Sequence, residues 1–277
     1  MITAARTLQP FGRLCFALAL LGLGAEHFVF KSFVTGRAPD WPAAGPGMLI
    51  WIYASGALIA AAGLAILAGR HARRAALLVG TLIFAWALLR HLPVIAGDAF
   101  LAPSWTRAGK ALALFGGAFA VAGTLPPWAG RRKGAWTRYA NQTDAFVLLG
   151  RIAVGVFLAN SGIQHFMYTP VVVSLIPEWF PGNATRWTQF AGGALIAGGV
   201  GLFFRPTAAL AALLSGLMVF SWVWLVHLSR ALTSVSDGIA VFEALAVAGI
   251  ALAMAGFLFE RRATNAARPR VASSGPA

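Results

Sequence analysis

Charged residues are scarce in this sequence. Only 11% of the 277 residues are charged, whereas a soluble globular domain usually carries about 25% because its surface needs polar cover. Hydrophobic residues make up 59% of the chain. This balance excludes a water-facing surface for most of the chain, and we expect lipid to be its solvent.

Cysteine is nearly absent as well, because Cys15 is the single one in the sequence. One thiol excludes an intramolecular disulfide and any Cys-x-x-Cys redox motif. Cys15 lies inside the first apolar run, where we expect a small packing residue.

Acidic residues are also few, with 8 Asp and Glu against 22 Lys and Arg and a net charge of +14. Such an excess could indicate nucleic-acid binding. The basic residues, however, lie in short gaps between apolar runs, as expected from the positive-inside rule, and they form no groove interleaved with aromatic residues. We therefore predict no nucleic-acid partner and take the lipid bilayer as the partner of these residues.

Several apolar runs approach the roughly 20 residues that cross the bilayer as a helix. The sequence thus predicts an all-α, polytopic membrane protein with about eight transmembrane helices. The predicted spans are 12–31, 47–69, 74–92, 107–125, 145–168, 188–204, 207–229 and 238–259. They divide the chain into a first four-helix unit (1–125), a polar linker (126–144), a second four-helix unit (145–260) and a disordered tail (261–277).

The basic residues also predict the orientation of the chain. The side that holds the N-terminus, the linker and the tail carries 15 of the Lys and Arg residues, and the other side carries seven. We therefore expect an inner-membrane protein with both termini in the cytoplasm. Arg13 and Arg151, at the starts of two helices, are predicted to be snorkelling anchors.

The two four-helix units match one another at offsets of 133 to 138 residues. The matches are Gly12-Arg13 with Gly150-Arg151, His27-Phe28 with His165-Phe166, Tyr53–Ala60 with Phe190–Ala197, Phe84–His91 with Phe220–His227, and Ala111-Leu112 with Ala244-Leu245. Each unit has an even number of helices, so the repeats are predicted to be parallel, with a pseudo-two-fold axis along the membrane normal. The recurrence of the first helix in mid-chain also indicates that it is retained and is not a cleaved signal peptide.

Eight polar residues inside the predicted spans are candidate site residues, and all eight fall in the outer half of the bilayer. They are Glu26, His27, His91, Lys110, Gln164, His165, His227 and Glu243. Ionisable residues are costly in a membrane and are functional candidates by default. One interpretation is a ligand-binding polar site. The alternative is packing, in which Glu26, His27 and His91 satisfy one another and Glu243 pairs with His165 or His227.

Metal and haem sites are only weakly indicated. No helix carries two ligands at i, i+3 or i+4 spacing, and no His-Glu-x-x-His motif is present. Imidazoles on neighbouring helices could still hold a metal or the edge of a haem. We assign no metal ligand and leave the cofactor open between a quinone and a haem.

The second unit resembles DoxX-type membrane proteins. The similarity rests on Gly150-Arg151, on the Gly-x-x-His-Phe stretch that ends at Phe166, on Leu175-Ile-Pro-x-Trp-Phe-Pro181, and on the Gly-rich helix that follows. The first unit is similar in a looser way, with Pro39-Asp-Trp-Pro42 in the corresponding loop. The resemblance implies an all-helical bundle associated with redox biology, since some such proteins are membrane subunits of thiosulfate:quinone oxidoreductases.

Three functions remain open at this point. The first is a membrane component of a redox or quinone-linked system, whose partners would be a quinone or a redox protein. The second is a non-catalytic assembly or scaffold subunit, in which the polar pairs only lock helix packing. The third is a small-solute transporter, which the parallel repeat favours. The sequence does not decide whether the protein is an enzyme.

Overall fold

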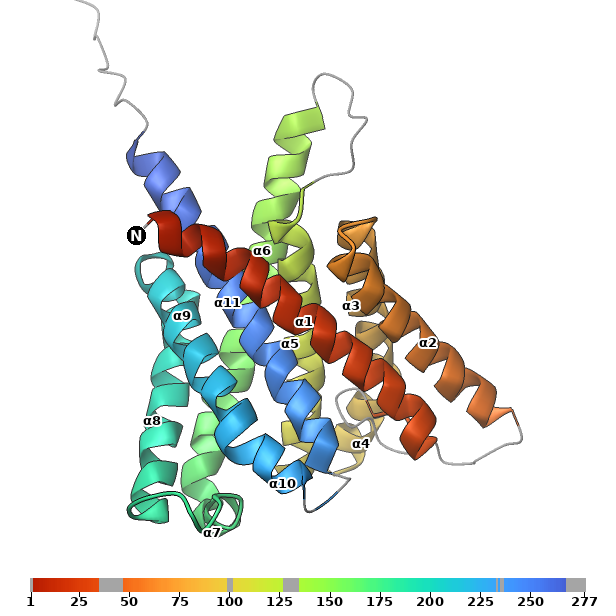
Figure 1. Cartoon of the computed structure of the whole chain (residues 1–277), viewed down its shortest axis with the longest axis vertical. Coiled ribbons are helices and arrows are strands. Elements are labelled where there is room, and N and C mark those ends of the chain that lie inside the picture. The colour runs from red at the N-terminus through yellow and green to blue at the C-terminus, as the bar shows by residue number, and fades with distance from the viewer. Residues whose placement is uncertain are drawn as a thin grey trace, which may run out of the picture.

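The computed structural model describes residues 2–34, 47–98, 102–126, 135–232, 234 and 237–267, and these residues form helices and turns without a strand. Figure 1 shows the arrangement. The α-helices are α1 (Ile2–Phe30), α2 (Met48–Leu67), α3 (Ala72–Trp86), α4 (Leu92–Gly97), α5 (Ala102–Thr124), α6 (Ala135–Met167), α7 (Thr169–Val173), α8 (Ala184–Phe203), α9 (Arg205–Trp222), α10 (Ser229–Ala231) and α11 (Gly238–Ala266). Two π-helical segments, η2 (Ala87–His91) and η3 (Val223–Leu228), interrupt the third and the ninth helix runs.

Six helical spans among the described residues are long and apolar enough to cross a membrane. They are Thr7–Phe30, Met48–Leu67, Ala72–Gly97, Gln142–Met167, Arg205–Ala231 and Gly238–Ala266. The chain is thus an all-α, polytopic membrane protein, which confirms the predicted fold class at this level. Helices α5 and α8 are not among the six; their first halves are the more polar, with Arg107 and Lys110 in α5 and Arg186 and Gln189 in α8.

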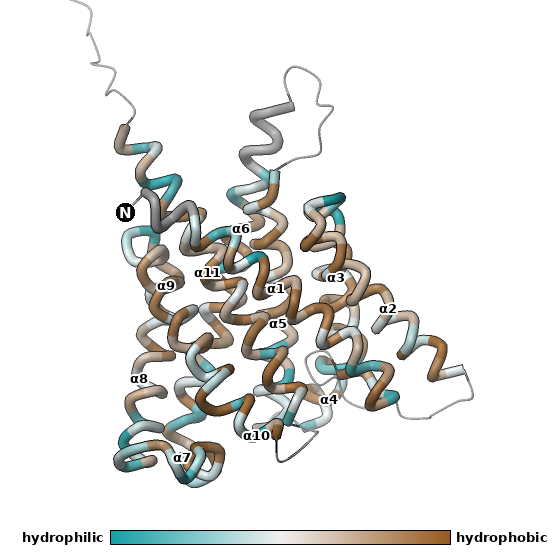
Figure 2. Tube along the Cα trace, in the orientation of Figure 1, coloured by the Kyte–Doolittle hydropathy of each residue, from teal (hydrophilic) through white to brown (hydrophobic). Residues whose placement is uncertain are grey.

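Helix α11 forms the centre of the bundle, where it packs against α1, α9 and α5 (Figure 1). Nearly every residue between Glu243 and Gly256 is buried. Most of this stretch is alanine, valine and glycine, which let neighbouring helices approach closely where lipid supplies no hydrophobic driving force. Helix α6 packs against α5 and α8, and α1 packs against α2 and α11. Figure 2 shows hydrophobic residues along the middle of the helices and hydrophilic residues gathered toward their ends.

Two helix crossings depend on direct backbone contact at glycine. Where α1 crosses α11, a Cβ added to Gly12 would lie 2.3 Å from Ala253 N and 2.5 Å from Gly249 O. Where α6 crosses α8, a Cβ added to Gly162 would lie 2.5 Å from Gly192 O. A side chain at either glycine would push its helix away from the neighbouring helix. Both crossings therefore require glycine at these positions.

Three helices extend beyond their predicted spans. Helix α1 begins at Ile2, α6 begins at Ala135 inside the predicted linker, and α11 continues to Ala266 inside the predicted tail. The extensions of α6 and α11 are joined by an ion pair between Asp144 and Arg261. Polar residues can continue a helix past the bilayer because the backbone keeps its own hydrogen bonds there. The remaining tail and the Pro39-Asp-Trp-Pro42 loop lie outside the described residues.

Two arginines satisfy the last carbonyl groups of neighbouring helices. Arg151 is buried and donates from Nε to Leu202 O at 2.8 Å and from Nη2 to Phe203 O at 3.0 Å, at the last turn of α8. Arg13 donates from Nε to Thr124 Oγ1 at 3.2 Å and from Nη2 to Thr124 O, at the end of α5. The last carbonyls of a helix have no partner within it and carry partial negative charge, so an arginine satisfies them. The prediction of snorkelling is therefore wrong for Arg151.

Candidate functional site

The shortest polar contact among the predicted site residues joins α5 to the central helix. Lys110 Nζ lies 2.6 Å from Glu243 Oε2, and the exposed fractions of the two side chains are 24% and 5%. The two residues come from different predicted units. The packing interpretation paired Glu243 with His165 or His227, whereas its salt-bridge partner in the structure is Lys110 of α5, which packs against α11. The contact places an ion pair between the two predicted units.

Glu26 and Gln164 also lie where the two predicted units meet. Thr106 Oγ1 donates to Gln164 Oε1 at 2.7 Å, which links the start of α5 to the end of α6. Glu26 is buried at the end of α1, and a Cβ added to Gly238 at the start of α11 would lie 3.5 Å from Glu26 Oε1. The end of α6 thus lies beside the start of α5, and the end of α1 lies beside the start of α11. In both places, the first helix of one predicted unit meets the fourth helix of the other.

The histidines of α1 and α6 have the same local geometry. His27 Nδ1 lies 2.7 Å from Leu23 O, and His165 Nδ1 lies 2.7 Å from Ser161 O. A carbonyl oxygen can only accept, so Nδ1 carries the hydrogen and donates in both residues. In the neutral imidazole the other nitrogen, Nε2, then has a lone pair and acts as an acceptor. Both helices therefore present an imidazole whose tautomer and orientation are fixed by the preceding turn.

Each of these imidazoles lies beside an aromatic ring, but the two histidines differ in exposure. The ring of His165 stacks on Trp222 with centroids 6.2 Å apart and planes at 23°. The ring of His27 meets Phe33 edge-on at 6.4 Å, and Phe33 contacts Trp86 at 4.4 Å. The exposed fraction of His27 is only 1%, whereas His165 is half-buried. The second unit thus has the more accessible histidine.

His91 and His227 lie in the π-helical segments. His91 is the last residue of η2 and is buried, and His227 is the next-to-last residue of η3 and is half-buried. Within the part of the chain that the structure describes, His91 Nε2 has no hydrogen-bond partner. A π-helical turn widens the helix by one residue and is found frequently at functional sites. Trp86 and Trp222 each immediately precede one of these segments.

The eight predicted residues do not converge on one point. Lys110 and Glu243 are in direct contact, whereas His27 packs against Gly56 of α2 and His165 packs against Gly192 of α8. The histidines therefore occupy two separate helix pairs. No group of three His, Cys, Asp or Glu side chains within the described ranges is placed to hold a metal ion.

Three further residues belong to this region and were not selected from the sequence. Arg90 is a buried cation beside His91, Thr106 donates to Gln164, and Trp222 stacks on His165. Arg90 carried a signal, because a charged residue inside an apolar run is itself unusual. Trp222 also carried one, since it matches Trp86 between the two units. Thr106 carried none, because a threonine near a helix start is ordinary.

Comparison with known proteins gives one match. Residues 154–260 match the family described as a domain of unknown function, DUF8561. The matched stretch begins within α6 and ends within α11, and so it lies inside the second predicted unit. No curated protein and no solved structure matches the chain. A function for this polytopic membrane protein has to be argued from the site.

Proposed function

We propose that this protein is a membrane component of a redox or quinone-linked system and that it binds a quinol beside His165. The observation that carries the proposal is the donation from His165 Nδ1 to Ser161 O, which makes Nε2 a hydrogen-bond acceptor. A quinol supplies two hydroxyl donors on a flat ring. The half-buried imidazole can accept one hydroxyl, and the ring of Trp222 beside it offers an aromatic face.

We propose a similar but closed site at His27 in the first unit. Its imidazole has the same tautomer as that of His165, yet it is almost fully buried and backed by Phe33. Ligand exchange needs access from the membrane, so we assign binding to the second unit. The histidine of the first unit would then hold the helices in the matching geometry.

The proposed fold is a duplication of eight membrane spans in two parallel four-helix units. Helices α5 and α8 have 23 and 20 residues, and at 1.5 Å per residue they reach about 30 Å or more, enough to cross the hydrocarbon core. The two π-helical segments at His91 and His227 support the duplication, because such segments are rare. The domain match, confined to the second unit, supports its proposed limits.

The proposed location is the inner membrane, with both termini in the cytoplasm. The support is the excess of basic residues on the side of the N-terminus, the 70–74 hairpin and the tail. The proposed quinol site then faces the outer half of the bilayer. A relationship to DoxX-type proteins is part of the proposal and rests on the motifs around His165.

A scaffold role is the second candidate, and a specific observation favours it. Lys110 pairs with Glu243 and Thr106 donates to Gln164, so several of the polar groups satisfy one another across the two units. Interhelical polar contacts of this kind stabilise packing in membrane proteins without binding a ligand. In that case the histidines would have no measurable affinity for quinol.

Quinol binding can be measured by quenching of Trp222 fluorescence with a short-chain benzoquinol, with a Trp222→Phe variant to identify the signal. The wild-type protein should bind the quinol more tightly than the oxidised quinone, because Nε2 accepts and does not donate. His165→Leu removes that acceptor and should weaken quinol binding about tenfold, which corresponds to about 1.4 kcal/mol.

His71→Leu is the matched control, since His71 is exposed in the α2–α3 hairpin and should leave quinol binding unchanged. Equal affinity of wild type and His165→Leu for the quinol would reject the assigned site. Absence of quenching in the wild type would favour the scaffold role instead.

A further inference from the structure

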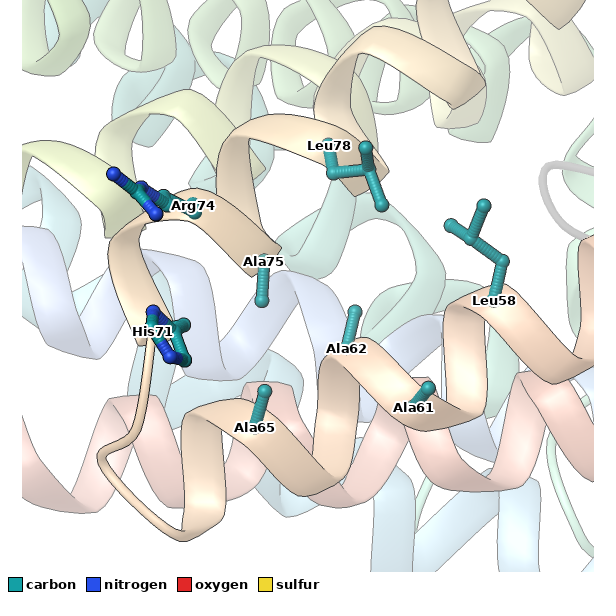
Figure 3. A pocket seen from close by; sticks show the side chains of 8 residues that line it. All are labelled: Leu58, Ala61, Ala62, Ala65, His71, Arg74, Ala75 and Leu78. Carbon is teal, nitrogen blue, oxygen red and sulfur yellow. The ribbon is translucent and has the colours of Figure 1, made fainter.

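A groove between α2 and α3 lies away from the polar residues described above. Its volume is about 290 Å³, at the lower end of the range for sites that bind small molecules. Leu58, Ala61 and Ala65 of α2 form one wall, and Ala75 of α3 lies on the other. Figure 3 shows the alanine side chains leaving an open trough between the two helices.

The groove is apolar along most of its length and basic at one end. Leu58 marks the apolar end, deep along α2, while His71 and Arg74 stand together at the hairpin end (Figure 3). Arg74 is exposed, and the residues that line the groove include no acidic side chain. An apolar trough that ends in two basic groups matches a molecule with a hydrocarbon chain and an anionic head.

The neighbouring residue, Arg73, does not line the groove. Arg73 turns the other way and donates from Nη1 to Ala122 O at 3.0 Å, at the end of α5. Arg73 therefore satisfies a carbonyl group at a helix end, whereas Arg74, one residue later on another face of α3, lines the groove. Arg73 thus stabilises the helix packing, and Arg74 is exposed at the groove.

We propose that this groove binds an anionic phospholipid, with an acyl chain along the alanine trough and the phosphate at His71 and Arg74. Basic pockets between transmembrane helices recognise anionic head groups where these lie at the polar boundary of the bilayer. The hairpin lies at the end of the bundle that also holds the N-terminus (Figure 1), where basic residues are concentrated. This site is independent of the proposed quinol site.

Native mass spectrometry of the detergent-purified full chain can test the proposal with phosphatidylglycerol as the probe. Arg74→Ala should lower the affinity for phosphatidylglycerol about tenfold. Arg70→Ala removes the same charge from the same hairpin, but Arg70 does not line the groove, so this control should retain most of the affinity. Equal losses in the two variants would indicate general surface charge and would overturn the proposal.

The apolar part of the site has its own test. Ala61→Trp fills the trough at an exposed position and should reduce phosphatidylglycerol binding, whereas Leu64→Trp, on an exposed face of α2 outside the groove, should not. Phosphatidylcholine and glycerol phosphate should each bind at least tenfold more weakly than phosphatidylglycerol. Equal binding of glycerol phosphate would indicate a site for free phosphates, and equal binding of phosphatidylcholine would indicate a nonspecific acyl-chain groove; either result would contradict the proposal.

Discussion

Lys110→Ala is expected to lower the free energy of unfolding by about 3 kcal/mol. The variant leaves the buried carboxylate of Glu243 without the ammonium group that lies 2.6 Å from it. Removal of one partner from a buried ion pair typically costs about 3–5 kcal/mol, and the partial exposure of Lys110 places this case at the lower end. Equilibrium unfolding in mixed detergent micelles gives the value directly.

The double variant Lys110→Met/Glu243→Leu separates the charge effect from packing. It removes both charges and keeps side chains of similar size, so its stability should lie within about 1 kcal/mol of the wild type. Arg186→Ala, which removes an exposed cation at the start of α8, is the control for net charge and should have little effect. If Lys110→Ala were as stable as Arg186→Ala, the ion pair would not join the two units.

Gly199→Ala is expected to destabilise the protein by about 2–3 kcal/mol. A Cβ at this position would lie 2.6 Å from Gly155 O and 2.7 Å from Ala159 N, both backbone atoms of α6. Neither atom can move without a shift of the whole helix, and overpacking of this kind costs about 1–3 kcal/mol. The same unfolding assay measures the change.

Gly193→Ala is the matched control in the same helix, because a Cβ there would meet no atom within 4 Å. Alanine is the better helix former, by about 1 kcal/mol in soluble helices, so this variant should be neutral or more stable. The opposite order of stability for the two variants would contradict the close crossing of α6 and α8.

The helical segments could be predicted from the sequence because apolar runs of the right length are long, local signals. All eight predicted spans are helical, and the structure differs mainly at the ends, as at Ala135 and Ala266. Those ends depend on polar residues, which are stable both in a helix and in a loop outside the membrane. The inward turn of Arg151 was not predictable, since it depends on where α8 ends in space.

The candidate residues could be selected one by one from the sequence, but their arrangement in space could not. The internal repeat identified Lys110 and Glu243 as matching positions, yet their pairing requires that α5 meets α11. Likewise, the sequence related His27 to His165 but could not show that each of their helices packs against the fourth helix of the other predicted unit, α1 on α11 and α6 on α5. The contacts between units are set by glycine positions on both partners, and one sequence does not show which glycine meets which.

The most direct test of the proposed quinol site is the quinone content of the purified protein, measured by solvent extraction and mass spectrometry. The account predicts about one quinone-type molecule per chain in the wild type and in His71→Leu, and a strong loss in His165→Leu. Wild-type protein that carries no quinone, or a His165→Leu variant that carries as much as the wild type, would contradict it.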